Sequence, residues 1–366
     1  MDERRRRLLR SFEAAPDEGA ALELVATGAR AADDEGFVAG LRYLADIARW
    51  DGLARDARVA LGELIAAAHP GLRFQRLTHY FLGQVSHEVL VFESDEDPAW
   101  MAAVAGRRDP RWSARIEYVF GPGLGPPPEP DDDSGPYQAT LRARDWLAWE
   151  PRPAIEWVLI PGGRVRLGWA GDLARAFRRW GPEVDEVLHQ EWVQRARARI
   201  RPPGEVELSP FLIERRPPPR LGADYLAAGG PPPDAAAEAA LAAIEAGLAG
   251  EGARLPTLDE WEHACGGGAT TLFRWGDLWP TTSPAVTTFD GHLVPNAYGL
   301  QYADEASLEL VSGPPCLKSG TASVWVGDVD WGDWSHAITS ARPTPPPAAP
   351  LAFAHARLRR VRALCD

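Results

Sequence analysis

The segment 323–334, SVWVGDVDWGDW, concentrates residue types that are well suited to recognising a ligand. Tryptophan faces stack on cations and aspartates pair with positive charge, so the segment suits a cationic or peptide partner. Its carboxylates are also of the kind that binds Ca²⁺. The other interpretation is that the tryptophans pack in the core while the aspartates cap turns. The candidate ligand-binding residues are Trp325, Asp328, Asp330, Trp331, Asp333 and Trp334.

Two histidines and a glutamate are candidate ligands for a metal ion. His79, His87 and Glu88 are of the types that form the two-histidine, one-carboxylate site of non-haem iron oxygenases. Their spacing is not that of two ligands one helical turn apart, and the sequence at 87–92 is typical of a β-strand. Ordinary surface or core residues are the alternative interpretation.

The three cysteines, Cys265, Cys316 and Cys365, lie far apart and form no CxxC unit. Their odd number and wide spacing argue against a disulfide scaffold and against a structural zinc site. Any thiol chemistry would therefore need the fold to bring two of them together.

Four segments are expected to position these residues. They are a helical unit at 1–70, a β-containing connecting segment at 71–120, a Pro/Gly/Asp-rich linker and lead-in at 121–150, and a C-terminal domain at 151–366. Apolar residues recur at helical spacing in 20–32, 36–50 and 53–68. Asp17, Asp34 and Asp51 are placed where a short acidic side chain caps a helix start.

The remaining elements are mostly short strands with turns. We expect strands at 74–81, 87–92, 115–120, 155–160, 165–168, 206–213 and 357–362, and helices within 172–200 and at 235–248 and 257–264. Thr257 and Glu260 form a capping-box pattern, and Trp261 should face inward. In the last strand Leu358 should point inward and the arginines outward, where they would pair with the excess of acidic residues.

The overall charge narrows the class of partner. The formal net charge is −13, which does not favour binding to nucleic acid or anionic lipid. The basic run Arg4–Arg7 is more typical of a solvated helix face.

No apolar run is long enough for a membrane span, and no signal peptide is evident, so a cytoplasmic location is expected. Lys318 is the sole lysine, a bias that suggests a GC-rich bacterial genome.

Six strings in the C-terminal half, taken in order, resemble the formylglycine-generating-enzyme (sulfatase-modifying-factor) family. The most specific is 254–277, RLPTLDEWEHACGGGATTLFRWGD. The others are 155–168 (IEWVLIPGGRVRLG), 206–213 (VELSPFLI), 295–300 (PNAYGL), 305–313 (EASLELVSG), and Arg342 with 358–362 (LRRVR). The resemblance implies that the C-terminal domain is irregular, low in secondary structure and related to C-type lectins. With the helical unit that precedes it, the chain is expected to be α+β.

Compared with the family that it resembles, this sequence lacks the copper-binding cysteines and the calcium-binding asparagine. The family's enzymes bind copper through two cysteines a few residues after a Gly-Gly-Ser string, but the corresponding segment here, Ser319–Ser323 and the residues after it, contains no cysteine. The family's Gly-Asn-Val calcium segment corresponds to 305–307, where the asparagine is absent and Asp304 or Glu305 is the candidate substitute.

The sequence therefore predicts a pseudoenzyme: a non-catalytic module that binds a protein or peptide, with no cofactor expected except possible Ca²⁺. The alternative is a metal-dependent oxidase, using non-haem iron or copper, of the sulfatase-modifying-factor and ergothioneine-synthase superfamily with a relocated site. The sequence predicts neither the partner nor the oligomeric state.

Overall fold

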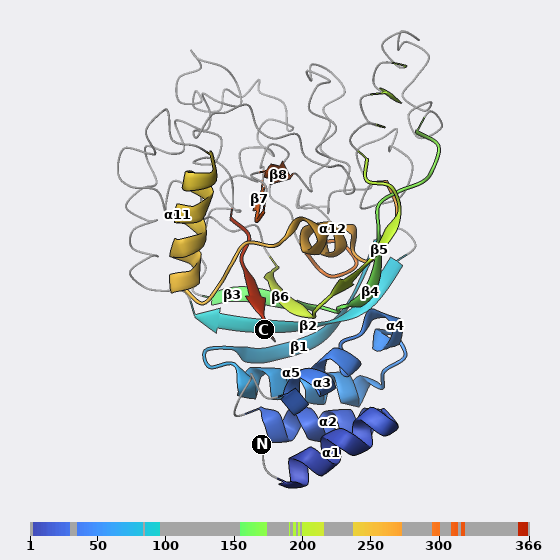
Figure 1. The fold of residues 1–366 in the computed structure, drawn as a ribbon, viewed down its shortest axis with the longest axis vertical. Helices are drawn as coiled ribbons and strands as arrows, with labels where there is room; N and C mark the ends of the chain where they lie inside the picture. Colours follow the sequence, from blue (N-terminus) through green and yellow to red (C-terminus); the bar gives the residue numbers. More distant parts are fainter. Residues whose placement is uncertain are drawn as a thin grey trace, which may run out of the picture.

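The computed structural model describes an α+β protein in which N-terminal helices precede antiparallel sheets (Figure 1). The described residues are 3–29, 35–82, 85–95, 154–173, 190, 193–194, 197, 200–215, 237–272, 295–300, 309–313, 316–318 and 358–364. The expected strand at 115–120, the linker at 121–150 and most of the expected helical segment within 172–200 lie outside them.

Within residues 3–29 and 35–68, five helices form the N-terminal layer, where the sequence shows three segments of helical periodicity. They are α1 (Glu3–Ala14), α2 (Glu18–Gly28), α3 (Glu35–Leu44), α4 (Ile47–Trp50) and α5 (Arg55–Ala68). Asp17 caps α2 as expected, because its Oδ1 accepts a hydrogen bond from the Ala20 amide at 2.8 Å.

The expected cap at Asp51 is wrong, and Asp34 lies outside the described residues. Asp51 follows the end of α4, whereas Asp46 caps the start of that helix by accepting from the Ala48 amide at 2.9 Å. The next helix, α5, begins after Ala54 without a side-chain cap. The reason is a short extra helix, which moves Asp51 from the start of one helix to the end of another.

A five-stranded antiparallel sheet with the order β1-β2-β3-β6-β9 follows the helices. Its strands are β1 (Arg73–Leu82), β2 (Val85–Asp95), β3 (Ala154–Ile160), β6 (Phe211–Glu214) and β9 (Val361–Ala363). The strands expected at 74–81 and 87–92 are present as β1 and β2, which form an antiparallel hairpin. Because β2 also pairs with β3, this hairpin belongs to the same sheet as strands from the C-terminal segment.

A separate two-stranded sheet corrects one expectation. The strand expected at 165–168 is β4 (Gly163–Leu167), which pairs with β5 (Gly204–Leu208) in a sheet separate from β3. The single strand expected at 206–213 is two strands, β5 and β6, which belong to different sheets. Gly162 permits the close approach of the chain before β4 to the end of β5, because a Cβ at this position would lie 2.3 Å from the Leu208 carbonyl oxygen.

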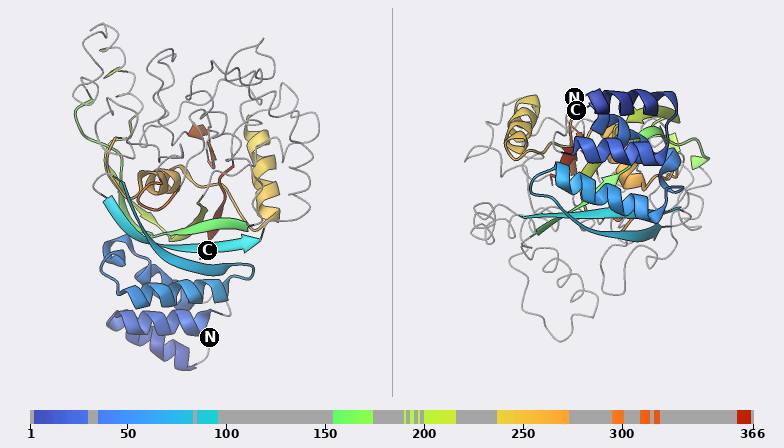
Figure 2. Two further views of the ribbon diagram at one scale, coloured as in Figure 1. Left: turned by 180° about the vertical axis from the view of Figure 1, so that it is seen from behind. Right: turned by 90° about the horizontal axis from the view of Figure 1, so that it is seen from below.

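The large sheet is covered on both faces. Figures 1 and 2 show the N-terminal helices on one side of it and α12 (Leu258–Gly266) on the other. Along β2, the residues Leu90 and Phe92 belong to the core shared with the helices, while Val89 and Val91 belong to the core shared with α12. The period-2 alternation of a strand thus supplies two cores at once.

The helix α12 matches its sequence pattern closely. Thr257 and Glu260 form a complete capping box, and Trp261 is fully buried. Glu260 pairs with Arg254 at 2.6 Å, and Glu262 lies 3.5 Å from Arg201. The other helix expected in this half is α11 (Ala237–Gly250).

The last strand, β9, begins only at Val361, and the residues before it differ from the expected side-chain pattern. Leu358 is buried as expected, but Arg359 and Arg360 are buried too, with 0% and 3% of their surface exposed. The expected pairing with acidic residues is nevertheless confirmed, because Arg359 binds Glu309 of β7 (Glu309–Val311) through two hydrogen bonds of 2.6 and 2.9 Å. A sequence pattern treats arginine as exposed, whereas a buried carboxylate can hold it inside.

Replacing Arg359 by methionine should destabilise the protein by about 3–5 kcal/mol, because it leaves the Glu309 carboxylate buried without its countercharge. Arg164→Met is the matched control: Arg164 and Glu205 are 75% and 65% exposed and 3.9 Å apart, so its loss should cost about 1 kcal/mol or less. Urea denaturation of both variants measures this. An equal loss of stability in the two variants would contradict the conclusion that the Arg359–Glu309 pair is buried.

Candidate functional site

The structure places the candidate residues unevenly. Trp325, Asp328, Asp330, Trp331, Asp333 and Trp334 all lie outside the described residues, as do Asp304 and Glu305. His79, His87 and Glu88 are described, on the β1–β2 hairpin. The metal hypothesis can therefore be compared with geometry, while the Trp/Asp segment stays a prediction.

The three hairpin residues do not converge on one point. His79 is exposed and lies opposite Glu88 in the antiparallel pair, so their side chains share a face of the sheet. The Glu88 carboxylate is 2.6 Å from the guanidinium of Arg58 on α5. His87 lies opposite Tyr80 and therefore faces the other way. Among the described residues, no group of three His, Cys, Asp or Glu side chains is arranged to hold a metal ion.

His87 instead joins the helical layer to the loop after α12. Its Nδ1 lies 3.1 Å from Oδ1 of Asp51, and its Nε2 lies 3.2 Å from the carbonyl oxygen of Gly267. The ring stacks on Tyr298 with centroids 4.7 Å apart. Both ring nitrogens therefore lie within hydrogen-bond distance of an oxygen, one from the helical layer and one from the loop after α12.

Tyr298 and His263 extend this contact into a buried polar cluster. The Tyr298 hydroxyl is 3.4 Å from Nε2 of His263, and that nitrogen is 3.0 Å from the Pro161 carbonyl oxygen, to which it donates. Desolvation lowers the pKa of His263 to about 4 and raises the pKa of Tyr298 above its ordinary value. Near neutral pH both side chains are therefore uncharged, which suits packing better than proton transfer.

Asn296 fixes the loop that carries Tyr298. Its Nδ2 donates to the carbonyl oxygens of Ala264 and Cys265 at the end of α12, at 2.6 and 3.0 Å. Its Oδ1 accepts from the amides of Tyr298 and Leu300, both at 3.0 Å. Sequence reasoning found the PNAYGL string only as a resemblance, because nothing in its spacing indicates contact with His87 or His263.

Of the three cysteines, Cys265 is the one whose surroundings the structure describes. Cys265 is fully buried in the core beneath α12. Cys316 begins β8 (Cys316–Lys318), opposite Val311 of β7. Cys365 lies outside the described residues.

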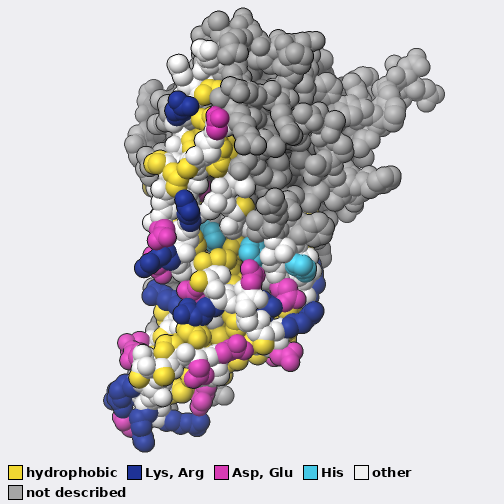
Figure 3. Space-filling view, turned by 90° about the vertical axis from the view of Figure 1, so that its right-hand side faces the viewer, with side chains coloured by type: hydrophobic (Ala, Val, Ile, Leu, Met, Phe, Trp, Pro, Cys, Tyr) yellow, Lys and Arg dark blue, Asp and Glu magenta, His cyan; other side chains and the backbone are white. Residues whose placement is uncertain are grey.

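The arginines of α1 form a basic group on the described surface. Arg4, Arg7 and Arg10 are 82%, 74% and 62% exposed, and each lies within 4 Å of a glutamate, either Glu3 or Glu23. Figure 3 shows basic side chains gathered at the end of the molecule that carries these helices. This agrees with the expected solvated helix face.

Comparison with known proteins adds no assignment: no family model and no curated protein matches the chain. None of the described helices is long and apolar enough to cross a membrane.

His263 should make stability depend on pH. The folded protein protonates this side chain only near pH 4, whereas the unfolded chain does so from about pH 6.5. The unfolded state thus binds the extra proton between these values, and stability falls as the pH drops from 6.5 to 4, by up to about 3 kcal/mol.

The variant His263→Gln keeps an N–H donor for Pro161 and removes the titration, so its stability should fall less over that range. Urea midpoints measured at several pH values for both proteins give the difference. If the urea midpoints of the two proteins changed with pH in the same way, His263 would not be a buried, neutral side chain.

Proposed function

We propose that this protein is a non-catalytic module that binds a protein or peptide, built on a sulfatase-modifying-factor-like domain of C-type-lectin relation. The observation that carries the proposal is the cysteine-free segment 319–334, which replaces the family's copper-binding thiolates with tryptophans and aspartates. Copper(I) requires soft sulfur ligands, and neither aspartate nor tryptophan supplies them.

The resembling strings have structural roles that support the domain assignment. The 254–277 string supplies the capping box and the buried Trp261, whose indole Nε1 donates to Glu309 at 3.1 Å. The 305–313 and 358–362 strings supply the two partners of the Glu309–Arg359 pair. Residues from strings far apart in the sequence thus meet in one buried network, as expected if they belong to one inherited fold.

The surroundings of Cys265 support the loss of oxidase chemistry at that thiol. Cys265 is surrounded by the apolar residues of the α12 core. Cys316 precedes the cysteine-free segment and lies on the short β7–β8 ribbon. The chemistry left to segment 319–334 is recognition: indole rings that stack on cations and carboxylates that pair with them.

Substitution of Trp331 or Asp330 by alanine should abolish capture of the partner without loss of folding. The partner would be identified by mass spectrometry of co-purifying proteins and its affinity then measured calorimetrically with purified components. Glu207→Ala, which removes an exposed carboxylate from β5, is the matched control and should bind normally. Loss of the folded circular dichroism spectrum in Trp331→Ala and Asp330→Ala would instead assign these residues to the core and contradict the proposal.

Metal analysis separates the proposal from an oxidase with a relocated site. A binding module should purify with far less than one equivalent of iron or copper and should not consume oxygen with a thiol substrate. Near-stoichiometric metal that disappears in His79→Ala or His87→Ala would contradict the proposal, because it would place an iron site on the β1–β2 hairpin.

A further inference from the structure

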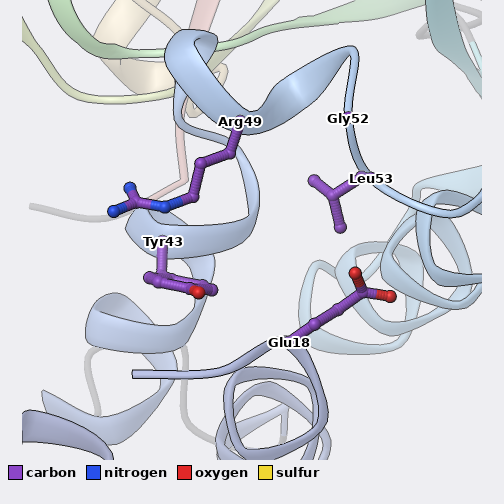
Figure 4. Close-up of a pocket in the computed structure, with 5 residues that line it drawn as sticks. All are labelled: Glu18, Tyr43, Arg49, Gly52 and Leu53. Carbon is purple, nitrogen blue, oxygen red and sulfur yellow. The ribbon is translucent and has the colours of Figure 1, made fainter. Parts of the chain in front are cut away.

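A small pocket opens among the N-terminal helices. It has a volume of about 240 Å³ and is lined by Glu18 of α2, Tyr43 of α3, Arg49 of α4, and Gly52 and Leu53 of the turn before α5. Figure 4 shows the side chains of Glu18, Tyr43 and Leu53 around the same space. Its size suits one extended side chain better than a drug-sized molecule.

One wall of the pocket is held rigidly. The Tyr43 hydroxyl donates to the Pro16 carbonyl oxygen at 3.2 Å, and the ring meets the edge of Phe12 at 5.2 Å. The guanidinium of Arg49 lies 4.4 Å from the centre of the Tyr43 ring and 3.5 Å from the Asp46 carboxylate. The positive charge of this wall is therefore already balanced within the protein.

The opposite wall carries a charge that is not balanced. Glu18 is half-buried, and no described residue forms an ion pair or side-chain hydrogen bond with its carboxylate. Figure 4 shows that carboxylate directed toward Leu53 and away from the Arg49 guanidinium. Leu53 is 8% exposed and offers apolar surface beside it. A partly desolvated carboxylate next to an aliphatic surface complements a cation carried on an aliphatic stem.

We propose that this pocket binds a lysine side chain of a peptide, with the ammonium group on the Glu18 carboxylate and the methylene stem along Leu53. Asp17 and Asp51, next to lining residues in the sequence, are committed to the Ala20 amide and to His87. Their charge adds to the negative field, while Glu18 supplies the direct contact. This inference does not rest on the proposed function, because it uses only the N-terminal helices.

The test is a titration of the full-length protein with acetyl-Gly-Lys-Gly-amide, followed by NMR at the Gly52 and Leu53 amides. We expect saturable shifts at both amides in the wild type and about fivefold weaker binding in Glu18→Gln. Glu63→Gln is the control: it removes an exposed carboxylate of α5 outside the pocket and should bind like the wild type. The same peptide with an acetylated lysine should cause no shift.

A steric variant tests the pocket without changing its charge. A Cβ at Gly52 would meet only the Arg49 carbonyl oxygen, at 3.4 Å, so Gly52→Val should fold and weaken binding by narrowing the pocket. Equal affinity in wild type, Glu18→Gln and Gly52→Val would overturn the proposal. Equal weakening by Glu18→Gln and Glu63→Gln would also overturn it, because it would reduce the binding to a general attraction of this acidic chain for cations.

Discussion

A buried charge pair organises the C-terminal half of this protein. Arg359 is fully buried and gives two hydrogen bonds to Glu309 and a third to the Glu214 carbonyl oxygen, at 2.6 Å. Glu309 also accepts from Trp261. A guanidinium without these acceptors would be very costly to bury, so β6, β7, β9 and α12 have to come together for any of them to be stable. The network thus fixes how short, irregular segments are arranged.

The large sheet connects this buried network to the N-terminal helices. Its two faces carry separate cores, one with Trp157 and the N-terminal helices and one with Val158 and α12. Arg360 and Arg362 lie over the Trp157 ring, at 5.4 and 4.7 Å from its centre. The C-terminal strand therefore contacts the same residue that the helical layer helps to bury, and the N-terminal helices act as one covering layer of the sheet.

The packing of the two cores uses several polar side chains that could otherwise take part in chemistry. Among the described residues, His87, His263 and Tyr298 are committed to contacts that join the sheet, α12 and the helical layer. Desolvation keeps His263 and Tyr298 uncharged near neutral pH. Such groups stabilise the fold, whereas the pocket that we propose for a lysine side chain relies on the carboxylate of Glu18.

Local patterns in the sequence determined the helices of residues 1–70, the β1–β2 hairpin and the capping box of α12, because each depends on residues a few positions apart. They could not determine that Arg359 and Arg360 are buried, that residues 206–213 divide between two sheets, or that His87 stacks on Tyr298. Those outcomes depend on partners far away in the chain, and only the tertiary structure brings a distant carboxylate or ring close enough to reverse a residue's ordinary preference for solvent.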